Sequence, residues 1–205
     1  MPYAGWTLVV PVKPLAEAKS RLAALGALRP RLALAFALDT VAAALACPAV
    51  ARVLVVTRDA AAAAPLTALG ATAIADEPGG GLNPALAHGA RAARRYAPHS
   101  PVATLSADLP ALRSAELARV LAAVPPRGRA FLADAPGTGT TLLAGAPGVA
   151  LRPAFGPDSR NGHAAGGARE LLLPDVPSVR RDVDTPADLA AAAALGLGPA
   201  TAALL

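Results

Sequence analysis

Short apolar runs of the kind that form β-strands alternate with longer Ala- and Leu-rich segments along this 205-residue chain. Such alternation is typical of α/β units around a largely parallel sheet. Most runs carry their apolar residues consecutively, as strands do when helices cover both faces of the sheet. We expect strands at residues 7–12, 52–57, 71–75, 102–106, 130–133, 141–145 and 178–181, and helices at 31–46, 60–69, 84–96, 114–123, 165–172 and 186–195. A helix start is clearest at Thr185-Pro186, with Thr185 as N-cap.

No fixed-period repeat and no long linker divides the sequence, so residues 1–205 are expected to form one domain. The two most apolar stretches, 32–47 and 189–205, are interrupted by polar residues, glycine or proline. Neither supplies the run of about 20 apolar residues that a membrane span needs. No secretion signal is evident, and Cys47 has no partner for an internal disulfide. We expect a cytoplasmic protein without membrane contact, and the sequence leaves open whether it forms a homodimer.

A formal net charge of +5 makes nucleic acid a partner to consider. All but two of the 19 basic residues are arginines, and they are scattered through expected helices. Only Arg94-Arg95 and Arg180-Arg181 are adjacent, and no aromatic side chains interleave with them as a base-stacking surface requires. The sequence therefore predicts no nucleic-acid partner.

The two lysines of the chain, Lys13 and Lys19, share one loop with Arg21 directly after the first expected strand. Cations just past the carboxyl end of a first strand are suited to binding a polyphosphate. A solvated surface turn is the alternative interpretation of this loop.

Carboxylates follow later strands in the same way. Asp108 comes directly after a buried run, Asp182 and Asp184 follow the last expected strand, and Asp76 and Glu77 follow the third. Because ligands bind at the carboxyl ends of strands in open α/β sheets, these groups are expected to converge on one crevice. Carboxylates close together favour a divalent cation, and Mg²⁺ prefers such oxygen ligands.

Each carboxylate also has an interpretation without a metal. Asp108 could cap the next turn, Asp184 could stabilise the start of the last helix, and Asp182 could pair with a neighbouring arginine.

A glycine-rich segment, residues 79–83, enters the helix expected at 84–96. Glycine lets the backbone approach a ligand closely, and the Asn83 amide offers a donor and an acceptor to a base or ribose. Asn83 could instead be the N-cap of that helix. Hydroxyls and backbone N–H groups at 138–141 and 155–159 could bind a second anion, and His163 could contact a phosphate or lie at the surface.

Several segments match a known family in order and number over nearly the entire chain: Val10–Leu15, Ala18–Leu22, Gly81–Asn83, Ala107–Leu112, Phe155–Ser159 and Asp182–Leu189. Together they resemble the 2-phospho-L-lactate and phosphoenolpyruvate guanylyltransferases of coenzyme F-420 biosynthesis. The wider relatives are MobA-like nucleotidyltransferases. The resemblance implies a three-layer α/β/α Rossmann-like fold with a mostly parallel mixed sheet.

The resemblance also implies a reaction, in which GMP passes from GTP to the phosphate of a small phospho-acid and pyrophosphate leaves. The implied nucleotide-binding residues are Lys13, Lys19, Arg21, Gly81 and Asn83. The first three, together with Asp108, are the implied catalytic residues.

Two further sets of residues follow from the resemblance. Asp108, Asp182 and Asp184 would hold Mg²⁺, and Thr140, Gly156 and Ser159 would bind the phospho-acid. The sequence does not separate phosphoenolpyruvate from 2-phospho-L-lactate or 3-phospho-D-glycerate as acceptor, because these acids differ by only a few atoms.

Three alternatives remain at this point. The first is another MobA-like enzyme with a molybdopterin or sugar-phosphate acceptor. The second is a metal-dependent nucleotide-sugar glycosyltransferase, since Asp182-Val183-Asp184 has the Asp-x-Asp form. The third is a nucleotide-binding module without catalysis.

Overall fold

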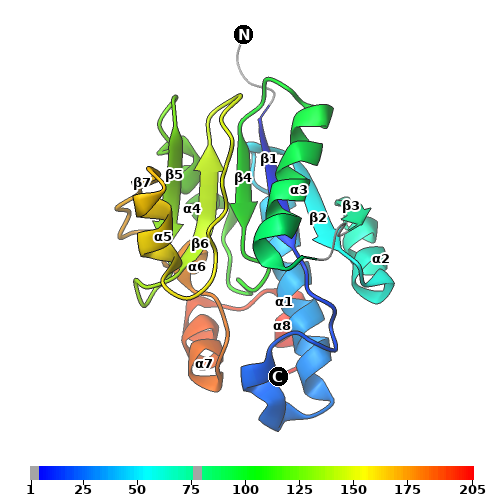
Figure 1. Ribbon diagram of the computed structural model, residues 1–205. Helices are drawn as coiled ribbons and strands as arrows, with labels where there is room; N and C mark the ends of the chain where they lie inside the picture. Colours follow the sequence, from blue (N-terminus) through cyan, green and yellow to red (C-terminus); the bar gives the residue numbers. More distant parts are fainter. Residues whose placement is uncertain (1–4, 76–79) are drawn as a thin grey trace.

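The computed structural model describes residues 5–75 and 80–205, and these form a twisted sheet with helices on both faces (Figure 1). The strands are β1 (Trp6–Pro11), β2 (Val50–Thr57), β3 (Thr72–Ala75), β4 (Val102–Leu105), β5 (Arg129–Ala133), β6 (Thr140–Gly145) and β7 (Arg169–Glu170). The helices are η1 (Ser20–Leu25, a 3-10 helix), α1 (Leu28–Leu45), α2 (Ala60–Ala68), α3 (Leu82–Tyr96), α4 (Ser114–Ala122), α5 (Ser159–Ala165), α6 (Pro177–Arg180), α7 (Pro186–Leu195) and α8 (Pro199–Ala202).

The sheet has seven strands in the order β3-β2-β1-β4-β6-β5-β7. The pairs β1–β2, β2–β3, β1–β4 and β5–β7 are parallel, and β6 runs antiparallel to both of its neighbours. The prediction of a mostly parallel mixed sheet between helical layers is therefore confirmed. Because β6 alone is reversed, its first residue, Thr140, lies at the edge where β4 and β5 end.

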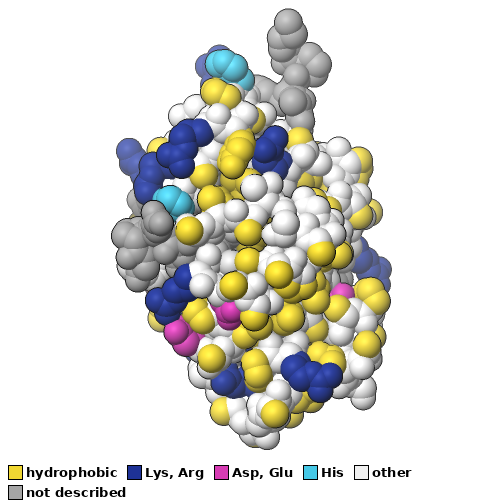
Figure 2. All heavy atoms as spheres, turned by 90° about the vertical axis from the view of Figure 1, so that its right-hand side faces the viewer, with side chains coloured by type: hydrophobic (Ala, Val, Ile, Leu, Met, Phe, Trp, Pro, Cys, Tyr) yellow, Lys and Arg dark blue, Asp and Glu magenta, His cyan; other side chains and the backbone are white. Residues whose placement is uncertain are grey.

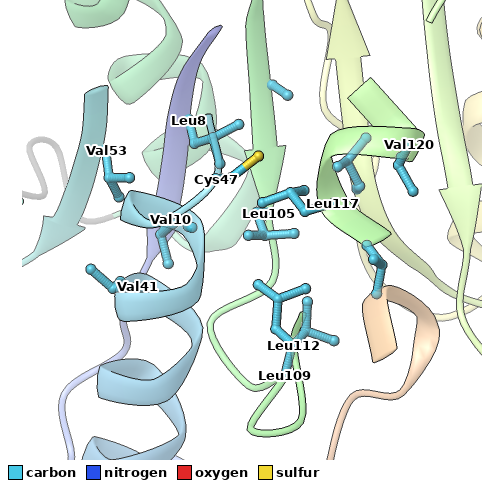
Figure 3. Close-up of a cluster of buried hydrophobic side chains, with 14 of the residues drawn as sticks. Leu8, Val10, Val41, Cys47, Val53, Leu105, Leu109, Leu112, Leu117 and Val120 are labelled. Atoms are coloured by element: carbon cyan, nitrogen blue, oxygen red, sulfur yellow. The ribbon is translucent and has the colours of Figure 1, made fainter. Parts of the chain in front are cut away.

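The alternation of side chains along β1 divides the core between the two faces of the sheet. Leu8 and Val10 pack with α1, α2 and α4 in the larger apolar cluster, part of which is shown in Figure 3, whereas Val9 packs with α3 on the opposite face. The α3 helix approaches closely because residue 89 is glycine: a Cβ there would lie 2.4 Å from Val9 Cγ1. Helices thus cover both faces of the sheet, which leaves the ends of the strands for a ligand to reach.

A third apolar cluster lies beyond the carboxyl ends of the strands, where η1 and α7 pack against the start of α1. Asp39 interrupts the apolar sequence of α1 because its buried carboxylate caps α8, accepting from Ala200 N at 2.9 Å and Thr201 N at 2.8 Å. This cluster anchors the segment around Asp182 and Asp184 beside the first loop.

Two predicted elements are wrong. The strand expected at 178–181 is the short helix α6, since Pro177 supplies its first turn and the Ser178 backbone N–H donates to the Glu116 carboxylate rather than to a strand. The helix expected at 165–172 lies earlier in the chain: α5 covers Ser159–Ala165 and ends at the residue where the expected helix would begin. Gly167, with φ +81°, then turns the chain into β7. The predicted Thr185 N-cap is confirmed, with a capping box to Asp188.

Of the helices in the described part of the chain, none has the length and apolarity to cross a membrane. Figure 2 shows the face formed by the α2–α3 side of the molecule, on which the Lys and Arg side chains lie in separate groups. The Arg52 guanidinium is stacked over the Tyr96 ring, with its central carbon 4.7 Å from the ring centroid.

Candidate active site

A cavity of about 570 Å³ opens at the carboxyl edge of the sheet. Its walls come from segments that are far apart in the sequence: residues 11–21, 106–108, 134–140 and 155–159, the pair Asp182 and Asp184, and single residues of α1 (Ala33, Ala37) and α3 (Leu82). The described residues thus bring the basic loop, the predicted carboxylates and the predicted acceptor residues to one cavity. Asp76 and Glu77 lie outside the described residues.

The basic loop after β1 is fixed by hydrogen bonds from neighbouring elements. The Leu15 backbone N–H donates to the Asp59 carboxylate at 2.8 Å, and the Arg29 guanidinium on α1 donates to the carbonyls of Ala16 and Ala18. Lys19 adopts a left-handed backbone conformation, φ 55°, at the start of η1. This conformation is uncommon for a residue with a Cβ.

The Lys19 ammonium lies between two carboxylates. It donates to Asp108 and, at 2.9 Å, to Asp184, and the exposed Arg21 guanidinium reaches the other oxygen of Asp184 at 3.2 Å. Burial lowers the pKa of Lys19, but Asp108 and Asp184 outweigh burial and raise it to about 12. The lysine therefore stays charged, and the solvated-turn interpretation of Lys19 is wrong. Lys13 is exposed and lines the same cavity.

Asp108 and the 182–184 segment are held together by the backbone. The Asp108 carbonyl accepts from Val183 N at 3.0 Å, and the next residue, Leu109, donates its N–H to the Thr40 hydroxyl of α1 at 3.0 Å. Asp108 therefore sits at a fixed turn between the sheet and α1, with its carboxylate facing the cavity.

Asp182 experiences more negative charge than its surroundings neutralise. Burial, and to a lesser extent the nearby carboxylates Asp108, Asp134 and Asp184, raise its pKa to about 7. The alternative pairing with a neighbouring arginine does not form: Arg180 donates to the carbonyls of Ala133 and Asp134, and Arg181 pairs with Asp188.

Asp134 is a carboxylate of the cavity that sequence reasoning missed. Its oxygens accept from the backbone N–H groups of Gly137, Thr138 and Gly139 at 2.7, 2.9 and 2.8 Å, and so shape the turn that leads into Thr140. The signal was present in the sequence: an Asp directly after an expected strand, followed by Pro136-Gly137, is a turn pattern in which the Asp side chain bonds the backbone.

Thr140, Gly156 and Ser159 all line the cavity. Gly156 has φ +139°, a backbone conformation that favours glycine. Asn83 holds the adjacent residue by two hydrogen bonds, donating to the Phe155 carbonyl at 2.9 Å and accepting from its N–H at 2.8 Å.

The Asn83 amide is thus committed to the protein, and it is not the N-cap of α3, which is Gly81. Of residues 81–83, Leu82 lines the cavity, and Gly81 and Asn83 are its neighbours in the sequence.

His163 is buried beneath this wall rather than at the surface. Its Nδ1 lies 3.1 Å from the Thr140 hydroxyl, and its Nε2 accepts from Ala154 N at 3.0 Å. Burial, and to a lesser extent the Arg129 charge, lowers its pKa to about 4, so the ring is neutral near pH 7. A direct role in phosphate binding does not fit this position.

The residues expected to hold a metal offer only carboxylate oxygens, which suit a hard cation such as Mg²⁺. Among the described residues no three acidic, histidine or cysteine side chains are arranged as a ready-made metal cage. Two of the expected ligands, Asp108 and Asp184, are instead bridged by the Lys19 ammonium. Burial and the neighbouring carboxylates both disfavour the charged form of Asp182, and a divalent cation would neutralise that negative charge. The donor set therefore fits such an ion once the Lys19 ammonium is displaced.

Comparison with known proteins shows which family this chain belongs to. Residues 27–182 match the MobA-like NTP transferase domain. The chain belongs to the MobA-like NTP transferase family. The match includes the strands and turns that carry Asp108, Asp134, Thr140 and Asp182.

Within the MobA-like family the chain is similar to proteins named phosphoenolpyruvate guanylyltransferase. It is 68% identical to the one from Streptomyces coelicolor over 201 residues, covering 97% of this chain and 95% of the relative. It is 64% identical to the one from Thermomonospora curvata over 200 residues, covering 97% and 88%. The family predicted from the sequence is confirmed.

The fold also resembles solved nucleotidyltransferases. A nucleotidyl transferase from Methanothermobacter thermautotroptrophicus superposes with a TM-score of 0.66 at 18% sequence identity, covering 93% of this chain and 97% of the other. At this identity the likeness concerns the fold alone, and it agrees with the Rossmann-like prediction.

Proposed function

We propose that this protein transfers GMP from GTP to the phosphate of phosphoenolpyruvate with release of pyrophosphate, in coenzyme F-420 biosynthesis. The observation that carries the proposal is the shared cavity: the basic loop, the three predicted carboxylates and the 155–159 segment open onto one space in a chain 68% identical to a phosphoenolpyruvate guanylyltransferase. The names of the relatives favour phosphoenolpyruvate over 2-phospho-L-lactate as the acceptor.

The proposed reaction needs positioning and charge neutralisation more than a protein nucleophile. An oxygen of the acceptor phosphate forms a bond to the α-phosphorus of GTP, and the bond from that phosphorus to the bridging oxygen of the β-phosphate breaks. Pyrophosphate leaves with the electron pair. The attacking phosphate is already anionic near pH 7, so a general base is not required.

Repulsion between the two anionic substrates is the main obstacle. Two unit charges about 4 Å apart repel by about 4 kcal/mol at an effective dielectric constant near 20. Lys13, Lys19 and Arg21 line the cavity and would offset part of this repulsion at the triphosphate.

Asp108, Asp182 and Asp184 are the residues that would hold Mg²⁺, and the ion would withdraw charge from the reacting phosphates. The acceptor would bind on the other wall, at the Thr140 hydroxyl and at Gly156 and Ser159. This division assigns one wall of the cavity to each substrate.

The test is a matrix of pyrophosphate-release assays with Mg²⁺. It combines four nucleoside triphosphates with phosphoenolpyruvate, 2-phospho-L-lactate and 3-phospho-D-glycerate, and includes molybdopterin and a sugar phosphate as further acceptors. We expect the highest kcat/KM with GTP and phosphoenolpyruvate. The highest rate with a molybdopterin or sugar-phosphate acceptor, or nucleotide binding without pyrophosphate release, would replace the proposal by one of the alternatives.

A further inference from the structure

The direction of each hydrogen bond at His163 can be deduced from its partners. The ring is 2% exposed and lies between Phe155, with ring centroids 4.8 Å apart, and Phe131, at 5.8 Å. The Ala154 backbone N–H can only donate, so the Nε2 atom that it contacts at 3.0 Å must accept. A neutral imidazole with Nε2 as acceptor carries its hydrogen on Nδ1. The Nδ1–H therefore donates to the Thr140 hydroxyl oxygen, 3.1 Å away.

This direction determines what Thr140 can offer a ligand. A hydroxyl has one hydrogen and accepts through its oxygen. Since the oxygen already accepts from His163, the hydroxyl hydrogen is left for another partner. In the described parts of the chain the Thr140 hydroxyl donates to no protein group, and Thr140 lines the cavity. A donor directed at a cavity is suited to an anionic oxygen.

The second hydrogen bond of His163 acts on the same wall of the cavity. Ala154 precedes Phe155 and Gly156, and the Phe155 backbone is held from the other side by Asn83. The buried His163 ring thus orients the Thr140 hydroxyl and holds the beginning of the segment that carries Gly156 and Ser159.

We infer that His163 is a positioning residue for the acceptor: by donating to Thr140 it fixes that hydroxyl as a hydrogen-bond donor to an anionic oxygen of the phospho-acid. This inference rests on the proposed function, since it takes the Thr140 wall to be the acceptor side. His163 acts through Thr140 and Ala154 and touches no substrate. The low pKa agrees with it, because a protonated ring would direct a second N–H against the Ala154 N–H.

Two substitutions separate the two hydrogen bonds. In His163→Asn the amide nitrogen takes the place of Nδ1 and can still donate to Thr140. In His163→Gln the amide oxygen can take the place of Nε2 and accept from Ala154, while the donor to Thr140 is lost. A matched control is His88→Gln, on α3 away from this wall. KM for phosphoenolpyruvate, KM for GTP and the melting temperature are measured for each variant.

We expect His163→Gln to raise KM for phosphoenolpyruvate about tenfold, as loss of a hydrogen bond to a charged group would. His163→Asn should raise it about threefold or less, and KM for GTP should change less than about twofold in both. In a Thr140→Val background, which lacks the hydroxyl, His163→Gln should add little to the acceptor KM. Calorimetric titration with phosphoenolpyruvate alone gives the same comparison without turnover.

Equal effects of the two His163 substitutions on both KM values, or full additivity with Thr140→Val, would overturn the inference and leave the proposed function standing. If either variant is too unstable to assay, Thr140→Ser against Thr140→Val decides: retention of acceptor affinity by serine alone supports a donor hydroxyl, and equal affinity refutes it. An unsubstituted protein that does not turn over GTP with phosphoenolpyruvate overturns the proposed function, and this inference with it.

Discussion

Replacing Lys19 by methionine tests whether its ammonium holds the two carboxylates that a metal would share. The Lys19 side chain is 11% exposed, and the side chains of its partners Asp108 and Asp184 are 22% and 45% exposed. Removing one member of a fully buried ion pair costs about 3–5 kcal/mol. Because both partners retain contact with water, we expect Lys19→Met to lower the free energy of unfolding by about 2 kcal/mol. For a protein of this size the melting temperature should fall by about 4–8 °C.

The same substitution should change the response to Mg²⁺. In the unsubstituted protein an ion must displace the ammonium from Asp108 and Asp184, whereas in Lys19→Met Asp108 loses its cation and Asp184 keeps only the exposed Arg21 guanidinium. Without nucleotide, Mg²⁺ should therefore stabilise Lys19→Met more than the unsubstituted protein. A free concentration ten times the dissociation constant adds about 1.4 kcal/mol. With GTP and phosphoenolpyruvate, turnover should fall and KM for GTP should rise.

The assay is thermal unfolding across a Mg²⁺ titration, followed by pyrophosphate-release kinetics. Lys13→Met is the matched control, because Lys13 lines the same cavity and is exposed. It should leave the melting temperature and its Mg²⁺ response nearly unchanged. Equal melting temperatures for the two variants, with the same Mg²⁺ response as the unsubstituted protein, would show that the Lys19 ammonium does not hold Asp108 and Asp184.

Three further predictions concern single carboxylates and the buried histidine. Asp108→Asn should lower kcat for pyrophosphate release at least about 100-fold; near-normal turnover would discard its metal role. Asp134→Asn should cost about 1–3 kcal/mol in the free energy of unfolding and raise KM for the acceptor, since the turn before Thr140 depends on its carboxylate; unchanged urea unfolding and KM would contradict this. Neutral His163 stabilises the fold above its ordinary pKa of 6.5, and this contribution is lost as pH falls toward about 4. The stability difference between the unsubstituted protein and His163→Asn should therefore shrink over that range in urea titrations, and a constant difference would count against the assigned pKa.

The sequence predicted the structure best where a pattern of side chains is compatible with only one kind of secondary-structure element. The consecutive apolar residues of β1 predict a strand buried on both faces, and Leu8, Val9 and Val10 do alternate between two apolar clusters. The family motifs also identified residues that meet in the cavity although Lys19 and Asp184 are 165 positions apart in sequence. The strand-end rule accounts for Lys19 and Asp108, which follow β1 and β4, whereas Asp184 follows the helix α6 and was identified by the family motif.

Tertiary contacts decided what local pattern could not. The valine and arginines of 178–181 suit a strand, but Val179 is buried against the larger apolar cluster from a helical turn that Pro177 begins. The sequence context of Asn83 suggested an amide that binds a ligand. In the structure the amide hydrogen-bonds the backbone of Phe155, a contact between residues distant in the sequence that local pattern does not predict. His163 could not be placed for the same reason, because both of its hydrogen-bond partners are brought to it by folding.

We propose that one cavity brings a guanosine triphosphate and a phospho-acid together for transfer at the α-phosphorus. GTP labelled at its α-phosphorus, incubated with the protein, Mg²⁺ and phosphoenolpyruvate, tests this transfer. We expect one labelled product that contains both GMP and phosphoenolpyruvate, formed in equal amount with unlabelled pyrophosphate. Label recovered only in free GMP or GDP, or unchanged GTP under these conditions, would contradict it.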